Sequence, residues 1–267
     1  MIEILQLLGN AIIETICLTG VIILIGFLLG ILRNNSLKNF QRSFGSKAMM
    51  ITGFIGVPIH ELSHALLAIV FGHKIKEIKL LQKPDSNGVM GYVNHSFNKN
   101  NLYHQVGNFF IGIAPIFGGG LSIIALMYFI IPGAYNQYLH ILIKNLQVKS
   151  FNKTIVKGIL TSYGELIKTI FSAQNFKNPW FYLFLFLSIC IASHISLSHA
   201  DIKGASKGLG IMFLILLVLN VFDIAQFITA IDVMKYNIFI TGILLIAVIL
   251  SVVTFMLSLF FVLIKQR

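Results

Sequence analysis

The stretch "GVPIHELSHALLAIVFG" at residues 56–72 places two histidines and a glutamate inside an apolar run. Ionisable side chains are costly in hydrocarbon, so those within a membrane span are functional candidates by default. Residues four apart share one face of a helix, which lets His60 and His64 direct both imidazoles at one ion. Glu61 then flanks that ion and can take a proton from a water molecule that the ion activates. The spacing predicts a zinc site with His60 and His64 as ligands and Glu61 as the general base.

The whole chain has the composition of a membrane protein. Its 267 residues are 57% hydrophobic and 11% charged, and the mean hydropathy is +0.87. Crossing a bilayer takes about 20 apolar residues, and six runs reach that length: 10–32, 48–72, 107–131, 179–199, 208–231 and 237–264. We therefore expect an all-α membrane protein with about six transmembrane helices in one domain. The first run is expected to be a retained helix, because it is too long for the apolar region of a signal peptide and lacks a basic segment before it.

Charge and cysteine content exclude other classes of protein. A net charge of +11 would suggest nucleic acid in a soluble protein, but here Lys and Arg flank the expected spans and meet anionic lipid headgroups. We therefore expect the lipid bilayer, and no nucleic acid, as a partner. The basic residues divide almost evenly between the two sides, so the topology stays open. Cys17 and Cys190 fall inside expected spans, which argues against a disulfide framework or a cysteine metal cluster.

Two segments between the spans carry their own patterns. In "KIKEIKLLQKPDSNGVMGYVNHSF" (74–97), two β-prone runs surround an Asn-Gly pair, which is typical of a β-hairpin. The alternation over 89–94 predicts a strand with two distinct faces. In "KTIVKGILTSYGELIKTIF" (153–171), apolar residues recur at steps of three and four with lysines between them. That pattern predicts a basic amphipathic helix in the headgroup region.

A catalytic zinc site usually has a third protein ligand and one open position. His73 follows His64 by nine residues, about half a turn round the helix, so it points elsewhere. The second and fourth expected spans run in the same direction. Asp201, at the end of the fourth, is therefore expected on the membrane side at which the C-terminal end of the histidine-bearing span emerges. Distances along the helices do not choose between the remaining candidates, which are Asp201, Asp223, His194 and His199.

These residues resemble the site-2 protease family of intramembrane zinc metalloproteases. "HELSH" lies in an expected span, "GIAPIFGGG" (112–120) opens the next span, and "ADIKG" (200–204) stands where the family has an Asp-Gly motif. The predicted hairpin lies where the family places a β element near its active site. The resemblance covers about residues 48–210, which leaves 1–47 and 211–267 as accessory segments.

The resemblance implies His60, His64 and Asp201 as ligands of Zn²⁺ and Glu61 as the catalytic base. It also implies an integral, multi-pass membrane protease, expected in a bacterial-type cell membrane, that hydrolyses peptide bonds of membrane proteins or peptides. The alternative is a non-proteolytic membrane zinc-binding protein with a role in transport, regulation or immunity. Acidic and histidine residues gather mostly at 60–64 and 194–201, which favours a single site over a transport path.

Overall fold

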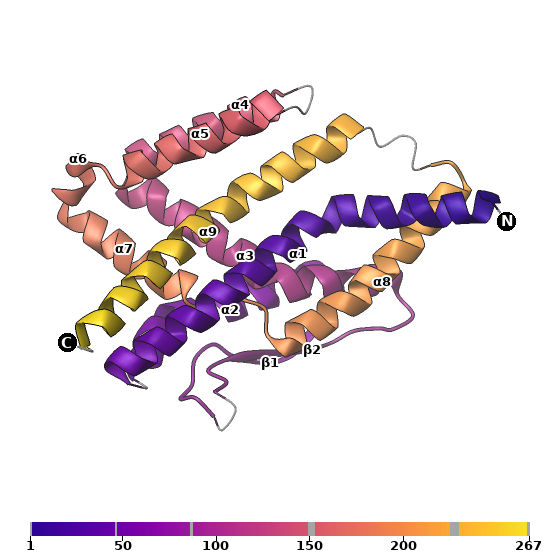
Figure 1. Cartoon of the computed structure of the whole chain (residues 1–267). Helices are drawn as coiled ribbons and strands as arrows, with labels where there is room; N and C mark the ends of the chain where they lie inside the picture. The colour runs from indigo at the N-terminus through magenta and orange to yellow at the C-terminus, as the bar shows by residue number, and fades with distance from the viewer. Residues whose placement is uncertain (1, 46, 86–87, 149–152, 225–229, 266–267) are drawn as a thin grey trace.

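The computed structural model describes residues 2–45, 47–85, 88–148, 153–224 and 230–265. It is an all-α membrane protein with one small antiparallel sheet, as the sequence predicts (Figure 1). The helices are α1 (Ile2–Phe44), α2 (Lys47–Val70), α3 (Leu102–Ile130), α4 (Pro132–Leu146), α5 (Lys153–Ile170), α6 (Ala173–Phe176), α7 (Pro179–Ala192), α8 (His199–Val221) and α9 (Ala230–Lys265), and the strands are β1 (Lys74–Lys79) and β2 (Tyr92–Ser96).

Five of the described helices, α1, α2, α3, α8 and α9, are long and apolar enough to cross a membrane. The prediction of six full spans is wrong at the fourth. Helix α7 has 14 residues, or about 21 Å, which is shorter than the hydrocarbon core of a bilayer.

The chain divides differently from the prediction between residues 179 and 231. The expected fourth span, 179–199, ends early at Ala192, and the expected fifth span, 208–231, corresponds to α8, which begins at His199 and ends at Val221. Residues 225–229 of that expected span lie outside the described residues. Ser198 begins α8 because its side chain accepts a hydrogen bond from the Asp201 backbone N–H, while the Asp201 carboxylate accepts one from the Ser198 N–H. This reciprocal capping box is a strong start signal for a helix. Asp201 therefore lies in the first turn of α8 and not at the end of the preceding span.

Helix α3 has a central position in the helix packing, because it contacts five other helices: α2, α4, α7, α8 and α9. The motif at 112–120 was expected to open a span, but it lies well inside α3. Its glycines face neighbouring segments: a Cβ on Gly118 would collide with Ser63 of α2, and a Cβ on Gly119 would collide with Ile195. Small residues of this kind allow apolar helices to pack at short distance.

The predicted hairpin forms, but its second strand starts late. β1 pairs with β2 in antiparallel register, with an irregularity between Ile75 and Glu77. Residues 89–91 form no regular strand, although the Met90 and Val89 carbonyls accept from the Gln82 and Asp85 N–H groups across the hairpin. The Met90 side chain is 5% exposed and lies against α2, where a Cβ on Gly53 would meet it. The Asn-Gly pair of the turn includes position 87, which lies outside the described residues.

Histidines fix the hairpin to the end of α2. His73 Nε2 donates to the carbonyl of His104 at 2.9 Å, and His73 Nδ1 lies 2.9 Å from Nδ1 of His95 on β2. Burial lowers the pKa of both His73 and His95, which favours the neutral pair that this geometry requires. β2 is thereby fixed beside the helix that carries "HELSH".

The amphipathic segment expected at 153–171 is helix α5. Its apolar residues Tyr163, Leu166 and Ile170 are buried, at 5%, 0% and 0% exposure, in the main hydrophobic core. Helix α5 contacts α4, so protein and not lipid covers much of its apolar face.

Candidate metal centre

Three of the predicted site residues meet in space. His64 Nε2 lies 3.2 Å from Asp201 Oδ1, His60 Nε2 lies 3.8 Å from Asp201 Oδ2, and the two Nε2 atoms are 3.2 Å apart. Within the described part of the chain, this is the one group of three His, Cys, Asp or Glu residues able to share an ion. The i,i+4 spacing on α2 and the first turn of α8 together build the group.

Hydrogen bonds to backbone carbonyls decide which imidazole nitrogens face the centre. His60 Nδ1 lies 3.0 Å from the carbonyl oxygen of His194, and His64 Nδ1 lies 2.7 Å from that of Ile111. A carbonyl only accepts hydrogen bonds, so each Nδ1 carries the proton and each Nε2 keeps its lone pair. Two lone pairs and a carboxylate therefore converge, and a shared cation removes their mutual repulsion. Carbonyls that orient metal-binding histidines in this way are common around metal sites.

The donor set fits zinc. Ligand atoms at 2.0–2.2 Å from a tetrahedral ion lie about 3.3–3.6 Å from one another. The two imidazole Nε2 atoms are 3.2 Å apart, and one ligand atom from each of the three residues lies within 4.8 Å of the other two. Two imidazole nitrogens and one carboxylate are the protein ligands of one class of catalytic zinc site, which leaves one position open. If one imidazole were protonated and no ion were bound, its Nε2–H could donate to only one of the neighbouring atoms, and the other close contacts would remain unfavourable.

Asp201 is held in place by the start of α8 and by its close contact with α3. Its Oδ2 accepts from the Ser198 N–H at 2.7 Å, which leaves Oδ1 directed at His64. A Cβ on Gly112 would lie 2.6 Å from the Asp201 carbonyl oxygen and 2.8 Å from Ala205 Cβ. Glycine at this position is what lets α8 approach α3 closely enough for Asp201 to reach the histidines.

Glu61 lies beside the ligands and under the hairpin. It is 7% exposed, and a Cβ on Gly91 would lie 2.9 Å from Glu61 Cγ and 2.7 Å from Val57 Cγ1. None of the described residues donates a hydrogen bond to its carboxylate. A buried carboxylate next to an ion site, with its oxygens uncommitted, is available to accept a proton.

The other candidates for third ligand lie elsewhere. His194 is buried, and its Nε2 lies 3.2 Å from Thr52 Oγ1, so its contribution is the carbonyl that orients His60. His199 is exposed, and Asp223 is exposed beyond the far end of α8, about 30 Å from Asp201 along the helix. The Ile111 carbonyl is available to His64 because Pro115, four residues later in α3, has no N–H to donate to it, which is a signal that the sequence carries. Nothing in the sequence marks the carbonyl of His194 in the same way.

We expect Asp201→Asn to lower zinc affinity at least tenfold and Asp223→Asn to leave it unchanged. Asparagine keeps an oxygen that can accept the Ser198 N–H, so the capping box survives while the anionic ligand is lost. Zinc affinity would be measured by competition with a chromogenic chelator. Loss of zinc from the Asp223 variant with retention in the Asp201 variant would contradict this assignment.

No protein-family model, curated protein or solved structure matches this chain. A function for it therefore has to be inferred from the metal centre and from the membrane-crossing helices.

Proposed function

We propose that the protein is an intramembrane zinc metalloprotease. It would be an integral, multi-pass protein of a bacterial-type cell membrane that hydrolyses peptide bonds in membrane-embedded or membrane-proximal substrates. One observation carries the proposal: Glu61, buried and uncommitted, lies within the metal-ligand helix α2, which is apolar enough to cross a membrane. A protein that merely stores or senses zinc has no use for a base at that position.

Each residue of the centre has a role in hydrolysis. His60, His64 and Asp201 would hold the zinc ion, which supplies Lewis-acid polarisation of the scissile carbonyl and lowers the pKa of water. Glu61 takes one proton from the attacking water as the new C–O bond forms. It then delivers that proton to the leaving amine as the C–N bond breaks, so one water molecule is consumed per peptide bond.

The hairpin offers a place for an unwound substrate. A helical peptide bond is shielded by its own hydrogen bonds, so a membrane substrate must become extended before hydrolysis. Val89 and Met90 are paired across the hairpin, because their carbonyls accept from the Asp85 and Gln82 N–H groups, and Gly91 packs on the Glu61 side chain. An extended segment could add through backbone hydrogen bonds along β2, whose other edge pairs with no described strand.

The test is metal-dependent cleavage of a defined reporter. Purified protein in liposomes would be incubated with a transmembrane peptide that contains a Gly-Pro helix break. We expect chelation to abolish cleavage and added zinc, but not magnesium, to restore it, as measured by mass spectrometry of the products.

The same preparation separates the proposal from the alternative. Protein that holds one zinc ion per chain, yet cleaves neither the broken-helix reporter nor an extended peptide, would favour a transport, regulatory or immunity role.

A further inference from the structure

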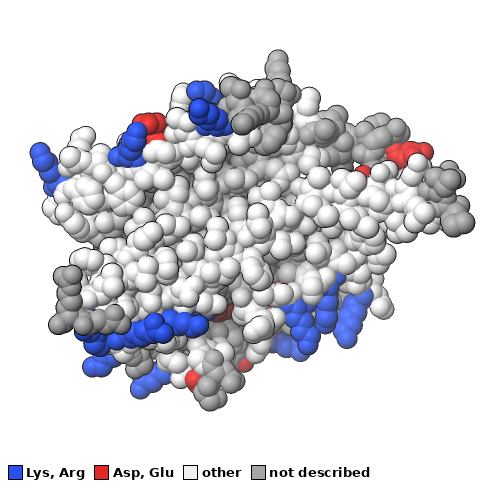
Figure 2. Space-filling model, in the orientation of Figure 1, with Lys and Arg blue, Asp and Glu red and all other residues white. Residues whose placement is uncertain are grey.

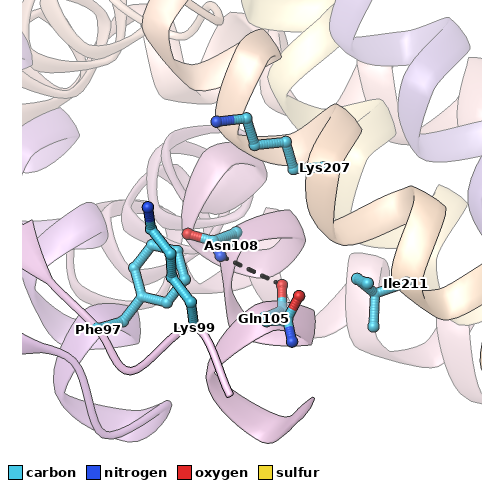
Figure 3. Close-up of a pocket in the computed structure, with 6 residues that line it drawn as sticks. All are labelled: Phe97, Lys99, Gln105, Asn108, Lys207 and Ile211. Atoms are coloured by element: carbon cyan, nitrogen blue, oxygen red, sulfur yellow. Dashed lines mark hydrogen bonds between the residues drawn. The ribbon is translucent and has the colours of Figure 1, made fainter. Parts of the chain in front are cut away.

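A basic pocket lies between α3, α8 and the loop that follows β2 (Figure 3). It has a volume of about 250 Å³ and is lined by Phe97, Lys99, Gln105, Asn108, Lys207 and Ile211. Lys207 follows Asp201 by six residues, or about 9 Å along α8. The pocket shares α8 with the metal centre but none of its candidate ligands, and α3, which lines the pocket, supplies the Ile111 carbonyl next to His64.

The polar lining of the pocket suits an anion. Lys99 and Lys207 come from different segments and both extend beside the pocket (Figure 3), and no acidic side chain lines it. Neither lysine forms an ion pair with any residue that the structure describes. Gln105 lies in the first turns of α3, where the helix dipole adds partial positive charge.

The apolar lining continues along α8. Lys207, Ile211, Leu214 and Val218 follow one another at helical steps of four, three and four, so they share one face. Leu214 and Val218 are 52% and 53% exposed. A ligand with its charge at Lys207 can therefore lay an apolar chain along this face.

The position of the pocket agrees with the headgroup level. Lys and Arg gather along the lower edge of the molecule in Figure 2, below a broad band of surface that carries almost none. Helix α8 begins at that lower edge and rises through the band (Figure 1). Basic pockets between membrane helices bind the phosphates of anionic lipids.

We propose that this pocket binds the phosphate of an anionic phospholipid, with Lys99 and Lys207 as its charged contacts and the face from Ile211 to Val218 under an acyl chain. Such a lipid bridges α3 and α8, the two helices whose contact at Gly112 positions Asp201. The proposal does not depend on the proposed hydrolysis, because lipid binding is measured directly.

Binding would be measured by native mass spectrometry of the full chain in neutral detergent, titrated with phosphatidylglycerol or phosphatidylcholine. Each near-surface lysine contributes about 1 kcal/mol to binding of anionic lipid. We therefore expect Lys99→Gln or Lys207→Gln to weaken phosphatidylglycerol about fivefold and the double variant about 25-fold. Phosphatidylcholine should bind weakly to every form.

Lys157→Gln on α5 is the matched control, because Lys157 is exposed and lies outside the pocket. It should leave phosphatidylglycerol binding unchanged. An equal loss of phosphatidylglycerol affinity in the control, or no loss in the double lysine variant, would contradict the assignment of this pocket as the lipid site.

Two further arms identify the source of the phosphate. Ile211→Ser should weaken phosphatidylglycerol while leaving the weak binding of glycerol 1-phosphate unchanged. If glycerol 1-phosphate binds as tightly as the lipid, the pocket is a site for soluble phosphates. If an acidic peptide displaces the lipid and its own binding is lost in the lysine variants, the pocket is a peptide site. Either outcome overturns the lipid assignment.

Discussion

Replacing Glu61 with glutamine is expected to reduce cleavage roughly 10²–10⁴-fold, the range for loss of a general acid–base group. Glutamine has nearly the same shape but cannot accept a proton at catalytic pH. The fold should survive, because none of the described residues donates a hydrogen bond to the Glu61 carboxylate. Zinc should stay bound, because the proposed ligands are His60, His64 and Asp201, which the substitution leaves in place. Reporter cleavage and metal content would be measured on the same preparation.

Glu165→Gln is the matched control, because Glu165 is an exposed carboxylate on α5 paired with Lys168. This variant should cleave at the wild-type rate. If Glu61→Gln also cleaves at that rate with zinc bound, Glu61 is not the base, and the proposed mechanism fails even if the metal site is correct.

Replacing both His60 and His64 with alanine is expected to reduce zinc from about one ion per chain to none. Asp201 alone cannot hold zinc, since a stable site needs several protein ligands. The substitutions also leave the carbonyls of His194 and Ile111 without their imidazole donors, which costs about 1–3 kcal/mol each where they remain buried. Elemental analysis should therefore be paired with a thermal unfolding curve.

His140→Ala controls for the loss of a histidine, because His140 is exposed on α4 and far in sequence from the centre. It should keep its zinc. Stoichiometric zinc in a folded variant that lacks both His60 and His64 would place the ion elsewhere and remove the basis for the protease proposal.

The parts of the site that sequence alone could predict depend on local periodicity. His60 and His64 face one point because they lie four apart on a helix, and that spacing holds wherever the helix packs. The membrane character follows from composition for the same reason, since run length and apolarity are properties of continuous segments. The hairpin could be located from its β-prone runs, although β2 begins only at Tyr92.

The expected fourth span shows where prediction from the mean hydropathy of a segment fails. The run at 179–199 is apolar enough to resemble one helix, but the polar residues from Ser193 onward and the cap at Ser198 divide it. A capping box outweighs the average hydropathy of the run, because it satisfies two backbone N–H groups at the start of a new helix.

Spacing along the helices left the candidate third ligand open between Asp201 and Asp223, because it says nothing about how α8 is placed against α2. The family resemblance favoured Asp201, and the tertiary structure is what brings Asp201 to the two histidines. Gly112 removes the side chain that would keep α8 away from α3, and the capping box turns one Asp201 oxygen towards His64. The sequence thus determined the membrane helices and the placement of the two candidate histidine ligands with their neighbouring glutamate, because these depend on spacing within one helix. Tertiary structure decided that the Asp201 carboxylate and the carbonyls of His194 and Ile111 meet the two histidines, because these contacts join segments far apart in the chain.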